Sequence, residues 1–248
     1  MITLNNFVVT PTIFPDKTSQ VWKLPDEALA LDWHHIVWYF ENEAEFMHLA
    51  QLRLLLKESR FVVLDLPYLP YARQDKKISN QTTFALTAFL ILLNSLQFNK
   101  INIFDAHNFT AVKDILANAT NAEPIAEINF AVRTVNANTI LYPDKGAYTR
   151  YNDLIQTDCC VVVAEKIRDQ LTGEIVKTKL TAPVHKTDRV LIVDDLCDGG
   201  ATFIKLMPLI KQASEVSLYV SHGIFSKGVQ VLKDAGISRI FTKSGEVK

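Results

Sequence analysis

The sequence predicts an α/β protein with two halves of similar size, each built on a mainly parallel β-sheet flanked by helices. Three observations lead to this prediction. Short, branched apolar runs alternate with helical stretches along the chain, as in parallel sheets that helices cover on both faces. The alternation loosens once, at residues 118–123, and then resumes. The length of 248 residues is enough for two modest domains with cores of their own.

The first half is predicted to contain three strands and two helices. Each strand is a short run of branched and aromatic apolar residues, and the runs lie at residues 34–40, 60–66 and 100–106. The first helix, residues 43–57, follows from apolar residues at helical spacing, namely Phe46, Leu49, Leu52 and Leu56. A second helix is expected at residues 81–97.

The second helix contains a strongly apolar segment, residues 84–93. No charged residue occurs between Lys77 and Lys100. Polar residues flank the segment on both sides, so it has about half the length that a membrane-spanning helix requires. We therefore expect a buried helix and no association with a membrane.

The second half repeats the alternation. Its helices are expected at residues 126–136, 200–213 and near 226–234, and its strands at residues 138–143, 158–166, 190–195, 215–222 and 238–243. Pro208 lies inside the second of these helices, where proline removes a backbone donor and clashes with the preceding turn. We expect it to kink or shorten that helix.

Composition excludes several classes of protein. A formal net charge of -1 gives no overall attraction for nucleic acid. The cysteines Cys159, Cys160 and Cys197 form neither a disulfide framework nor a zinc-binding spacing, so a reducing cytoplasm is expected. Residues 1–14 lack the basic region and the apolar core of a signal peptide.

Three loops carry more polar residues than solubility alone requires. They lie at residues 67–79, 105–108 and 194–202, each after a predicted strand, where open α/β sheets bind ligands. The last belongs to "RVLIVDDLCDGGATF", residues 189–203. There a buried strand ends in Asp194 and Asp195, and a glycine turn leads into the next helix.

The glycine turn is predicted to bind a phosphate group. Glycines let backbone N–H groups approach an anion, Thr202 adds a hydroxyl, and the helix N-terminus adds a favourable potential. Asp194 and Asp195 are poor partners for phosphate but good acceptors for a diol, or for magnesium held by one. Ribose 5-phosphate combines these groups. The alternative, in which the aspartates only cap a helix and the glycines only form a tight turn, stays open at this point.

The same stretch resembles the signature that binds phosphoribosyl diphosphate in phosphoribosyltransferases and ribose-phosphate diphosphokinases. A second stretch, "PYLPYARQDKK" at residues 67–77, is similar to the ATP-binding segment of the diphosphokinases, which simple transferases lack. Its residue types fit a nucleotide, because arginine and lysine supply cations for a polyphosphate while Gln74 and Asp75 supply polar contacts. A basic loop alone is equally well explained by solvation, but the two stretches together favour the diphosphokinases.

Two further segments match that family in the ATP-binding half. "FPDKTSQVW", residues 14–22, resembles a segment that reaches the adenine of a neighbouring subunit's ATP. Phe14 and Asp16 match it, whereas Lys17 and Thr18 replace the family's glycine and glutamate. "FDAH", residues 104–107, resembles a motif whose histidine contacts the magnesium–ATP complex, which implies this role for His107.

The other half contains two more matching segments. "YPDKGAYTR", residues 142–150, resembles a motif that implies a contact of Asp144 with magnesium or ribose. "AEKIRD", residues 164–169, resembles the family's mobile catalytic segment and places Lys166 and Arg168 where charge builds up on the transferred diphosphate. The "TGEI" that follows is typical of a hairpin turn. The family's usual first strand–helix unit and C-terminal helix have no recognisable counterpart.

The resemblance covers about residues 14–242. It implies two phosphoribosyltransferase-like domains, with ATP bound by residues 1–122, ribose 5-phosphate bound by residues 123–248, and the active site between them. The expected reaction moves the β,γ-diphosphate of ATP to the C1 hydroxyl of ribose 5-phosphate and yields phosphoribosyl diphosphate (PRPP) and AMP. It also implies a homo-oligomer, a dimer or higher, and magnesium with contacts from His107 and Asp144.

The roles implied for individual residues fall into three groups. The ATP-binding residues are Phe14, Asp16, Arg73, Gln74, Asp75 and His107. The residues that bind ribose 5-phosphate are Asp194, Asp195, Asp198, Gly199, Gly200, Ala201 and Thr202. The catalytic residues are Lys166 and Arg168, which are expected to stabilise the transition state.

Two alternative functions stay open. A phosphoribosyltransferase that uses PRPP keeps the glycine-turn motif but has no use for the ATP-binding, histidine and K-x-R motifs together. A catalytically silent regulatory homologue keeps the fold and loses catalytic residues. The presence of Lys166, Arg168, His107 and both aspartates argues against a silent protein.

Overall fold

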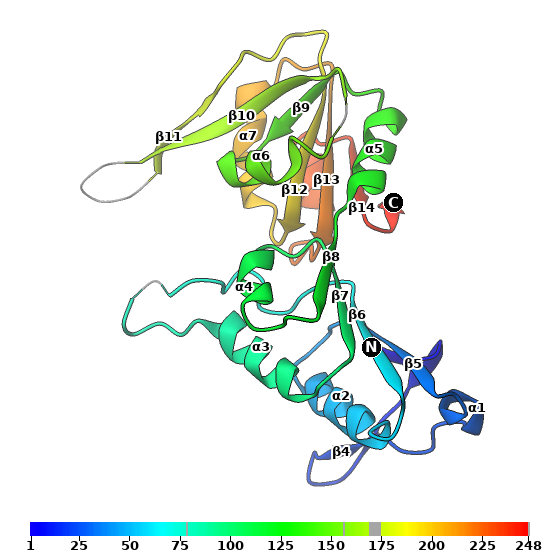
Figure 1. Ribbon diagram of the computed structural model, residues 1–248. Helices are drawn as coiled ribbons and strands as arrows, with labels where there is room; N and C mark the ends of the chain where they lie inside the picture. The colour runs from blue at the N-terminus through cyan, green and yellow to red at the C-terminus, as the bar shows by residue number, and fades with distance from the viewer. Residues whose placement is uncertain (78, 156, 169–174, 248) are drawn as a thin grey trace. The chain divides into compact units, whose positions relative to one another are not determined.

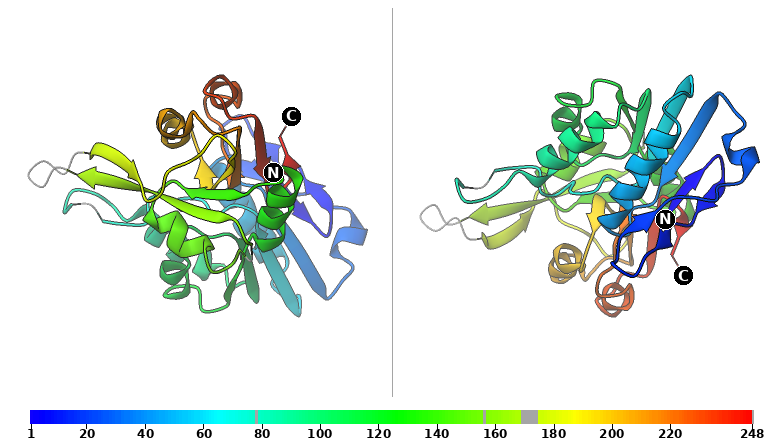
Figure 2. Two further views of the ribbon diagram at one scale, coloured as in Figure 1. Left: turned by 90° about the horizontal axis from the view of Figure 1, so that it is seen from above. Right: turned by 90° about the horizontal axis from the view of Figure 1, so that it is seen from below.

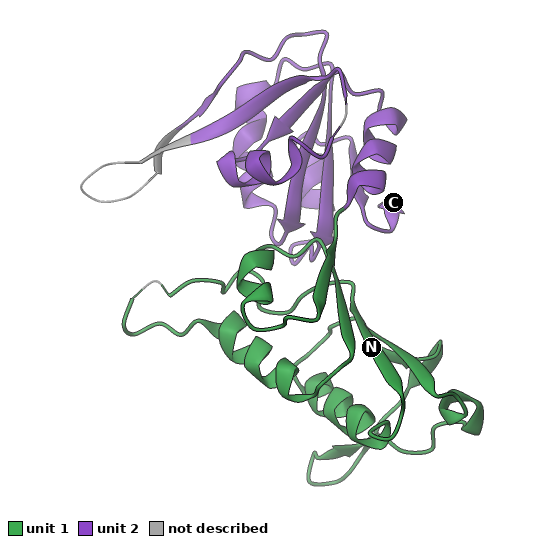
Figure 3. Ribbon diagram, in the orientation of Figure 1, with its two compact units in different colours: residues 1–123 green, residues 124–248 purple. Residues whose placement is uncertain are grey.

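The chain divides into two compact units, which are described separately: unit 1, residues 1–123, and unit 2, residues 124–248 (Figure 3). The computed structural model describes residues 1–77, 79–155, 157–168 and 175–247, and of residues 166–168 and 175–177 the backbone alone.

Unit 1 is built on a six-stranded sheet with the order β2-β1-β5-β6-β7-β8 (Figure 1). Its parallel strands are β5 (Trp33–Trp38), β6 (Phe61–Leu66), β7 (Lys100–Phe104) and β8 (Ala119–Ala122). Two antiparallel strands, β1 (Ile2–Leu4) and β2 (Phe7–Val9), extend the sheet beside β5.

The prediction of a loose stretch at residues 118–123 is wrong, because β8 lies there. Its sequence, Ala-Thr-Asn-Ala, contains little that favours a strand. Pairing with β7, from Ala119 opposite Ile101 to Ala122 opposite Phe104, provides the order. The neighbouring strand therefore overrides a weak local preference.

Helices α2 (Ala44–Leu55) and α3 (Ala85–Ser95) pack against one face of this sheet (Figure 1). They bury Leu49, Leu52, Leu86, Phe89, Leu90 and Leu93. The outer side of α3 leaves Ile91 57% and Leu92 55% exposed, so the expected buried helix is buried on one side only. Two short helices, α1 (Asp26–Leu29) and α4 (Phe109–Lys113), complete unit 1. No helix among the described residues has the length and hydrophobicity needed to cross a membrane.

The opposite face of the sheet carries a row of polar side chains across four strands. His35 Nε2 lies 2.8 Å from Asp65 Oδ2, Asn102 Nδ2 donates to Asp65 Oδ1 over 2.6 Å, and Thr120 Oγ1 donates to Asn102 Oδ1 over 2.8 Å. These residues alternate with those that face the helices, as strand geometry requires. These contacts link the four polar side chains to one another on a partly exposed surface.

Unit 2 is built on a seven-stranded sheet with the order β11-β10-β9-β12-β13-β14-β15. The parallel strands are β9 (Thr139–Tyr142), β10 (Cys160–Arg168), β12 (Arg189–Cys197), β13 (Glu215–Gly223) and β14 (Arg239–Thr242). The two edge strands, β11 (Ile175–Leu180) and β15 (Gly245–Glu246), are antiparallel to their neighbours.

Helices cover both faces of this second sheet, and β12 contributes to both cores. Val190 and Ile192 pack in the cluster that contains α7 (Ala201–Ile210) and α8 (Gln230–Asp234). Leu191 and Val193 pack in the cluster that contains α5 (Ile125–Thr134) and α6 (Lys145–Tyr151). The alternation along β12 confirms the prediction of a buried parallel strand between two helical layers.

Strands β10 and β11 form an antiparallel arm that extends from unit 2 (Figures 1 and 2). Their pairing runs from Ala164 opposite Leu180 to Arg168 opposite Ile175. The arrangement agrees with a hairpin. Of the predicted "TGEI" turn, residues 172–174 lie outside the described residues.

Helix α7 ends at Ile210, three residues before the predicted end and two after Pro208. Of the two expected effects of Pro208, shortening is therefore observed. Pro208 is exposed on the helix, so its ring does not contribute a buried contact that the unit requires.

Replacement of Pro208 with alanine is expected to stabilise unit 2. Alanine restores a backbone donor and removes the ring clash, worth about 3 kcal/mol in a helix interior, while the unfolded chain regains entropy worth about 1 kcal/mol. We expect a net gain of about 1–2 kcal/mol in the free energy of unfolding, measured by urea denaturation. Lys205→Ala, on an exposed turn of the same helix, is the control and should change stability by less than about 0.5 kcal/mol. Equal or lower stability of Pro208→Ala would contradict this account.

Candidate functional site

Phe14 and Asp16 lie at the tip of a hairpin formed by β3 (Thr12–Ile13) and β4 (Ser19–Gln20). Asp16 Oδ1 accepts hydrogen bonds from the Thr18 backbone N (3.0 Å) and Thr18 Oγ1 (2.7 Å). The Thr18 side-chain hydrogen bond is the main reason that the pKa of Asp16 lies below its usual value. Lys17 adopts a φ of 72°, the left-handed conformation that favours glycine. Thr18, at the position of the family's glutamate, thus holds the Asp16 carboxylate within the turn.

The hairpin is attached to helix α2 through its side chains. Gln51 Oε1 accepts from the Val21 backbone N over 2.7 Å, and Gln51 Nε2 donates to the Ser19 carbonyl over 2.9 Å. His48 Nε2 lies 2.6 Å from Ser19 Oγ. These contacts hold the base of the hairpin and leave its tip exposed.

The predicted ATP-binding loop follows β6 and is anchored by the buried residues Leu69 and Ala72. Arg73 and Gln74 are exposed, whereas Asp75 is only 9% exposed. The Gln74 backbone N donates to the Tyr71 carbonyl over 2.9 Å, and the Gln74 carbonyl accepts from the Leu86 backbone N over 3.2 Å. The loop is therefore fixed to the start of α3 at Gln74.

Tyr71 provides a second anchor for this loop. Its backbone has a φ of 62°, and its hydroxyl donates to Glu43 Oε1 over 2.5 Å. This hydrogen bond is the main reason that the pKa of Tyr71 is raised. The hydrogen bond to Glu43 thus helps to hold Tyr71 in a backbone conformation that is otherwise unfavourable.

His107 lies in the next loop, between β7 and α4. On one side of it, the Asp105 backbone N donates to the Ala122 carbonyl and the Ala106 backbone N donates to Asn121 Oδ1, each over 2.8 Å. On the other side, Asn108 caps α4, because its Oδ1 accepts from the Ala111 backbone N over 3.1 Å.

Asn108 also connects the two loops of unit 1. Its Nδ2 donates to Asp75 Oδ2 over 3.0 Å. The structure thereby brings the loop of Arg73, Gln74 and Asp75 next to the loop of His107. The sequence motifs identified both loops but did not identify Asn108, although an asparagine directly before a helix is a usual capping signal.

In unit 2, Asp194 and Asp195 lie inside β12 and not at its end, which corrects the sequence prediction. The strand continues to Cys197, because Leu196 and Cys197 still pair with His222 and Gly223 of β13. The carboxyl groups of Asp194 and Asp195 nevertheless lie close enough to interact through both charge and a side-chain hydrogen bond.

The two carboxylates have different partners. Asp195 is 7% exposed, and its Oδ2 lies 3.4 Å from Nη1 of Arg150 in the last turn of α6. Asp194 Oδ1 accepts from the Asp195 backbone N over 2.9 Å. Desolvation raises the pKa of Asp194 well above its ordinary value, and the charge of Asp195 adds to this effect. Arg150 was missed as a site residue, although it closes the "YPDKGAYTR" segment.

Asp144 lies at the N-terminus of α6. Its Oδ1 accepts from the Ala147 backbone N over 3.1 Å, so that it caps this helix. Its charge also contributes to the raised pKa of Asp194. Asp144 therefore belongs electrostatically to the same group as the carboxylates of β12.

The glycine turn joins β12 to α7. Gly200 has a φ of 77°, and a Cβ atom there would lie 2.7 Å from Leu232 Cδ2 of α8, so only glycine fits without displacement. A Cβ on Gly199 would lie 3.4 Å from Cδ and Cε of Lys227, which places that side chain over the turn. Asp198 and Thr202 are exposed, and α7 begins at Ala201.

The predicted catalytic residues Lys166 and Arg168 lie on β10, opposite Thr178 and Ile175 of β11. Their side chains lie outside what the structure describes. Ile167 and Arg168 flank a shift in the register of the pairing.

No group of three or more histidine, cysteine, aspartate or glutamate side chains among the described residues is arranged to hold a metal ion. Magnesium is commonly bound by one or two carboxylates together with substrate oxygens and water. Asp194 and Asp195 are carboxylates of the kind that such a shared site uses.

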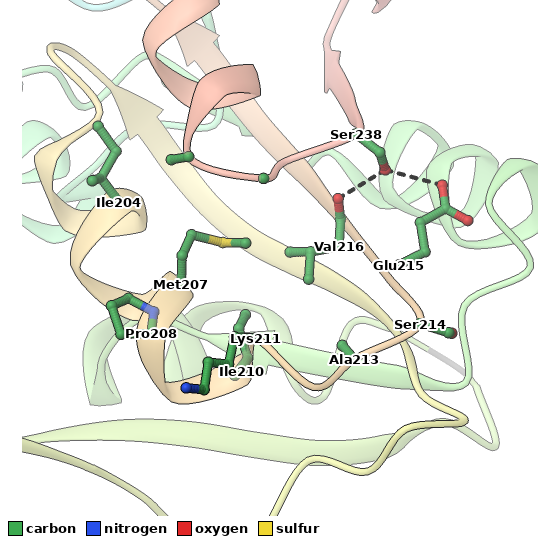
Figure 4. Close-up of a pocket in the computed structure, with 12 residues that line it drawn as sticks. Ile204, Met207, Pro208, Ile210, Lys211, Ala213, Ser214, Glu215, Val216 and Ser238 are labelled. Atoms are coloured by element: carbon green, nitrogen blue, oxygen red, sulfur yellow. Dashed lines mark hydrogen bonds between the residues drawn. The ribbon is translucent and has the colours of Figure 1, made fainter.

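Each unit contains a pocket outside the predicted site residues. A pocket of about 560 Å³ in unit 2 lies beside α7 and the start of β13 (Figure 4). Ile204, Met207 and Pro208 line it, and Ser238 Oγ lies 3.0 Å from Glu215 Oε1. It contains none of the predicted site residues. A pocket of about 370 Å³ in unit 1 is lined mainly by aromatic and apolar side chains and includes the Tyr71–Glu43 pair.

Comparison with known proteins identifies relatives along most of the chain, although no family model matches it. A ribose-phosphate pyrophosphokinase of Sulfolobus acidocaldarius is 25% identical over 243 residues, which covers 93% of this chain and 81% of that protein. The enzyme of the same name from Mycoplasmopsis pulmonis is 28% identical over 181 residues. That second match covers 69% of this chain and only 55% of the relative.

The fold matches a solved structure over nearly the whole chain. The crystal structure of phosphoribosylpyrophosphate synthetase from Mycobacterium smegmatis has a TM-score of 0.77 and covers 95% of this chain and 79% of its own. The sequence identity is 17%, so this likeness concerns the fold. It confirms the predicted class of two phosphoribosyltransferase-like α/β domains.

The raised pKa of Asp194 predicts a pH-dependent stability. The folded protein retains a proton that the unfolded chain releases above about pH 3.8, so this group's contribution to stability is lost as the pH rises towards the folded-state pKa. Asp194→Asn cannot lose that proton. We expect the variant to have a higher melting temperature than the parent at pH 7, and the difference to shrink as the pH falls to about 4.

Melting temperatures between pH 3.5 and 8 test this expectation. Asp195→Asn is the matched comparison, because the Arg150 guanidinium already lies near that carboxylate, and a smaller gain is expected. A difference between Asp194→Asn and the parent that does not vary with pH would argue against the assigned cause.

Proposed function

The chain belongs to the ribose-phosphate pyrophosphokinase family, and we propose that it is an active ribose-phosphate diphosphokinase. It transfers the β,γ-diphosphate of ATP to the C1 hydroxyl of ribose 5-phosphate. The products are PRPP and AMP.

The observation that carries this proposal is the presence in one chain of two different kinds of loop whose residue types suit the binding of anions. Unit 2 contains the carboxylate-rich strand and glycine turn that a phosphoribosyltransferase also needs. Unit 1 adds a loop with exposed Arg73 and Gln74, tied to the loop of His107 through Asp75 and Asn108. A protein that only consumes PRPP has no need for this second arrangement, so the combination supports the diphosphokinase over the transferase.

In unit 2, the turn of residues 198–202 would hold the 5-phosphate. Backbone N–H groups at the start of α7 and the exposed Thr202 hydroxyl are suitable donors. Asp194 and Asp195 would accept hydrogen bonds from the ribose hydroxyls or hold magnesium together with Asp144. A bound cation would favour the ionised form of Asp194, whose pKa burial raises.

In unit 1, Arg73, Gln74, Asp75 and His107 would bind ATP with its magnesium. Arginine suits this role because its planar guanidinium donates two parallel hydrogen bonds to phosphate oxygens. Phe14 and Asp16 would act on the ATP of a neighbouring subunit in a homo-oligomer, a dimer or higher. The exposed hairpin tip is compatible with that role.

The transfer itself requires little covalent chemistry from the protein. The C1 oxygen of ribose 5-phosphate bonds to the β-phosphorus of ATP, and the bond from this phosphorus to the oxygen bridging the α-phosphate breaks. AMP leaves with that oxygen, and the hydroxyl proton passes to solvent. Lys166 and Arg168 would neutralise the charge that develops on the diphosphate, and magnesium would supply further neutralisation.

Analysis of the products of one reaction mixture tests the function. With magnesium, ATP and ribose 5-phosphate, we expect AMP and PRPP in equal amounts, and neither when ribose 5-phosphate or the divalent cation is omitted. Formation of ADP would indicate an ordinary kinase. No product from a protein that binds both substrates would indicate a silent homologue, whereas consumption of PRPP with a nucleobase would indicate a transferase.

Lys166→Ala separates stabilisation of the transition state from substrate binding. If Lys166 acts on charge that develops during transfer, kcat falls by about 10²–10³-fold, as for the loss of one strong electrostatic contact, while KM for both substrates changes little. Steady-state kinetics provide the measurement. A large rise in KM with unchanged kcat would instead assign Lys166 to substrate binding.

A further inference from the structure

The two ATP-binding loops proposed for unit 1 are joined by one asparagine side chain. Asn108 Nδ2 donates to Asp75 Oδ2 over 3.0 Å, and Asn108 Oδ1 accepts from the Ala111 backbone N over 3.1 Å. Asp75 and Asn108 are 33 positions apart in the chain. The side chain thus uses its donor on one loop and its acceptor on the helix that follows the other loop.

We propose that Asn108 is a positioning residue for ATP, which acts by holding Asp75 and the backbone on either side of it in one arrangement relative to His107. This inference rests on the proposed function, since it assigns Arg73, Gln74, Asp75 and His107 to one nucleotide. Asn108 itself need not touch ATP.

The burial of Asp75 gives the contact its importance. The residue is 9% exposed, and Asn108 Nδ2 is the hydrogen-bond donor that the described residues supply to its carboxylate. A carboxylate in such surroundings is destabilised when its donor is removed. Without Asn108, Asp75 lowers its free energy by turning towards water, and the part of the loop after Gln74 is no longer held beside the His107 loop.

The other attachments of the loop do not replace this one. Tyr71 is bound to Glu43 through its hydroxyl, and Gln74 is bound to Leu86 through its carbonyl. Both attachments precede Asp75. The end of the loop that carries Asp75 is therefore held to the His107 loop through Asn108 among the described contacts.

The chemistry of asparagine explains why this residue type suits the position. One amide offers a donor to the carboxylate and an acceptor to the helix N-terminus. Serine retains the cap, but its side chain is too short to bridge to Asp75 as well. Aspartate also caps a helix, but it places a second negative charge against Asp75.

The test compares Asn108→Ser, Asn108→Ala and the parent protein. Both variants lose the bridge, so we expect KM for ATP and the dissociation constant of magnesium–ATP to rise about tenfold or more, as for loss of a hydrogen bond to a charged group. KM for ribose 5-phosphate should stay within about twofold. Only Asn108→Ala should also lower the melting temperature clearly, because it loses the cap as well.

Asn99→Ala is the matched control. Asn99 precedes β7, and its Oδ1 accepts from the Val62 backbone N over 2.7 Å. This variant loses one asparagine contact at the opposite end of the strand. We expect lower stability with an unchanged KM for ATP.

A reciprocal exchange gives a second test that does not depend on stability. Asn108→Asp alone should weaken ATP binding most, because two carboxylates then face each other. Adding Asp75→Asn restores a donor–acceptor pair of opposite direction, so the double variant should bind ATP more tightly than Asn108→Asp. Asp75→Asn alone measures the loss of the Asp75 carboxylate itself. If Asp75→Asn changes ATP binding by the same factor in the parent and in Asn108→Asp, the bridge is contradicted.

The failure of this inference differs from the failure of the proposed function. If the parent protein forms AMP and binds magnesium–ATP while Asn108→Ser binds it equally well, Asn108 is only a helix cap and the proposed function stands. If the parent protein itself does not bind magnesium–ATP in calorimetric titration, the proposed function and this inference both fail.

Discussion

Burial of β12 on both faces is the constraint on which the functional part of unit 2 depends. The strand must supply apolar side chains to two helical layers at once, and Val190 to Val193 do so in alternation. Asp194 and Asp195 continue the same strand, so they inherit a desolvated position and repel each other. The Arg150 guanidinium, which lies 3.4 Å from Asp195 Oδ2, offsets part of this desolvation and repulsion for Asp195. The unfavourable position of Asp194 lowers the stability of unit 2 locally. A loss of stability of this kind is common at functional sites.

The two units fix their proposed ligand loops by different means. Unit 1 uses side chains, since Tyr71 binds Glu43 and Asn108 binds Asp75. Unit 2 uses close backbone packing, since Gly200 leaves no room for a side chain beside Leu232. In unit 2, any side chain at Gly200 is strained by the φ of 77° and requires the Leu232 side chain to shift.

The hairpin of residues 12–20 is stabilised by contacts of its own side chains and of helix α2. Thr18, which replaces a glutamate, binds Asp16 through both its hydroxyl and its backbone N. Lys17, which replaces a glycine, accepts a left-handed conformation that costs about 1 kcal/mol in a non-glycine residue. Gln51 and His48 of α2 hold the base of the same hairpin. The hairpin is thus held both at its tip and at its base.

The sequence by itself determined the fold class, most strands and helices, and the three loops that carry polar chemistry. It could do so because these features depend on local periodicity, on apolar runs and on short motifs such as the glycine turn. It did not reveal β8, whose order comes from β7, or the continuation of β12 past its aspartates. Only the tertiary structure decided the contacts of Asn108 with Asp75 and of Arg150 with Asp195, which are 33 and 45 positions apart. Such contacts depend on strand order and register, which bring distant loops to one edge of a sheet, and no local pattern in the sequence encodes that placement.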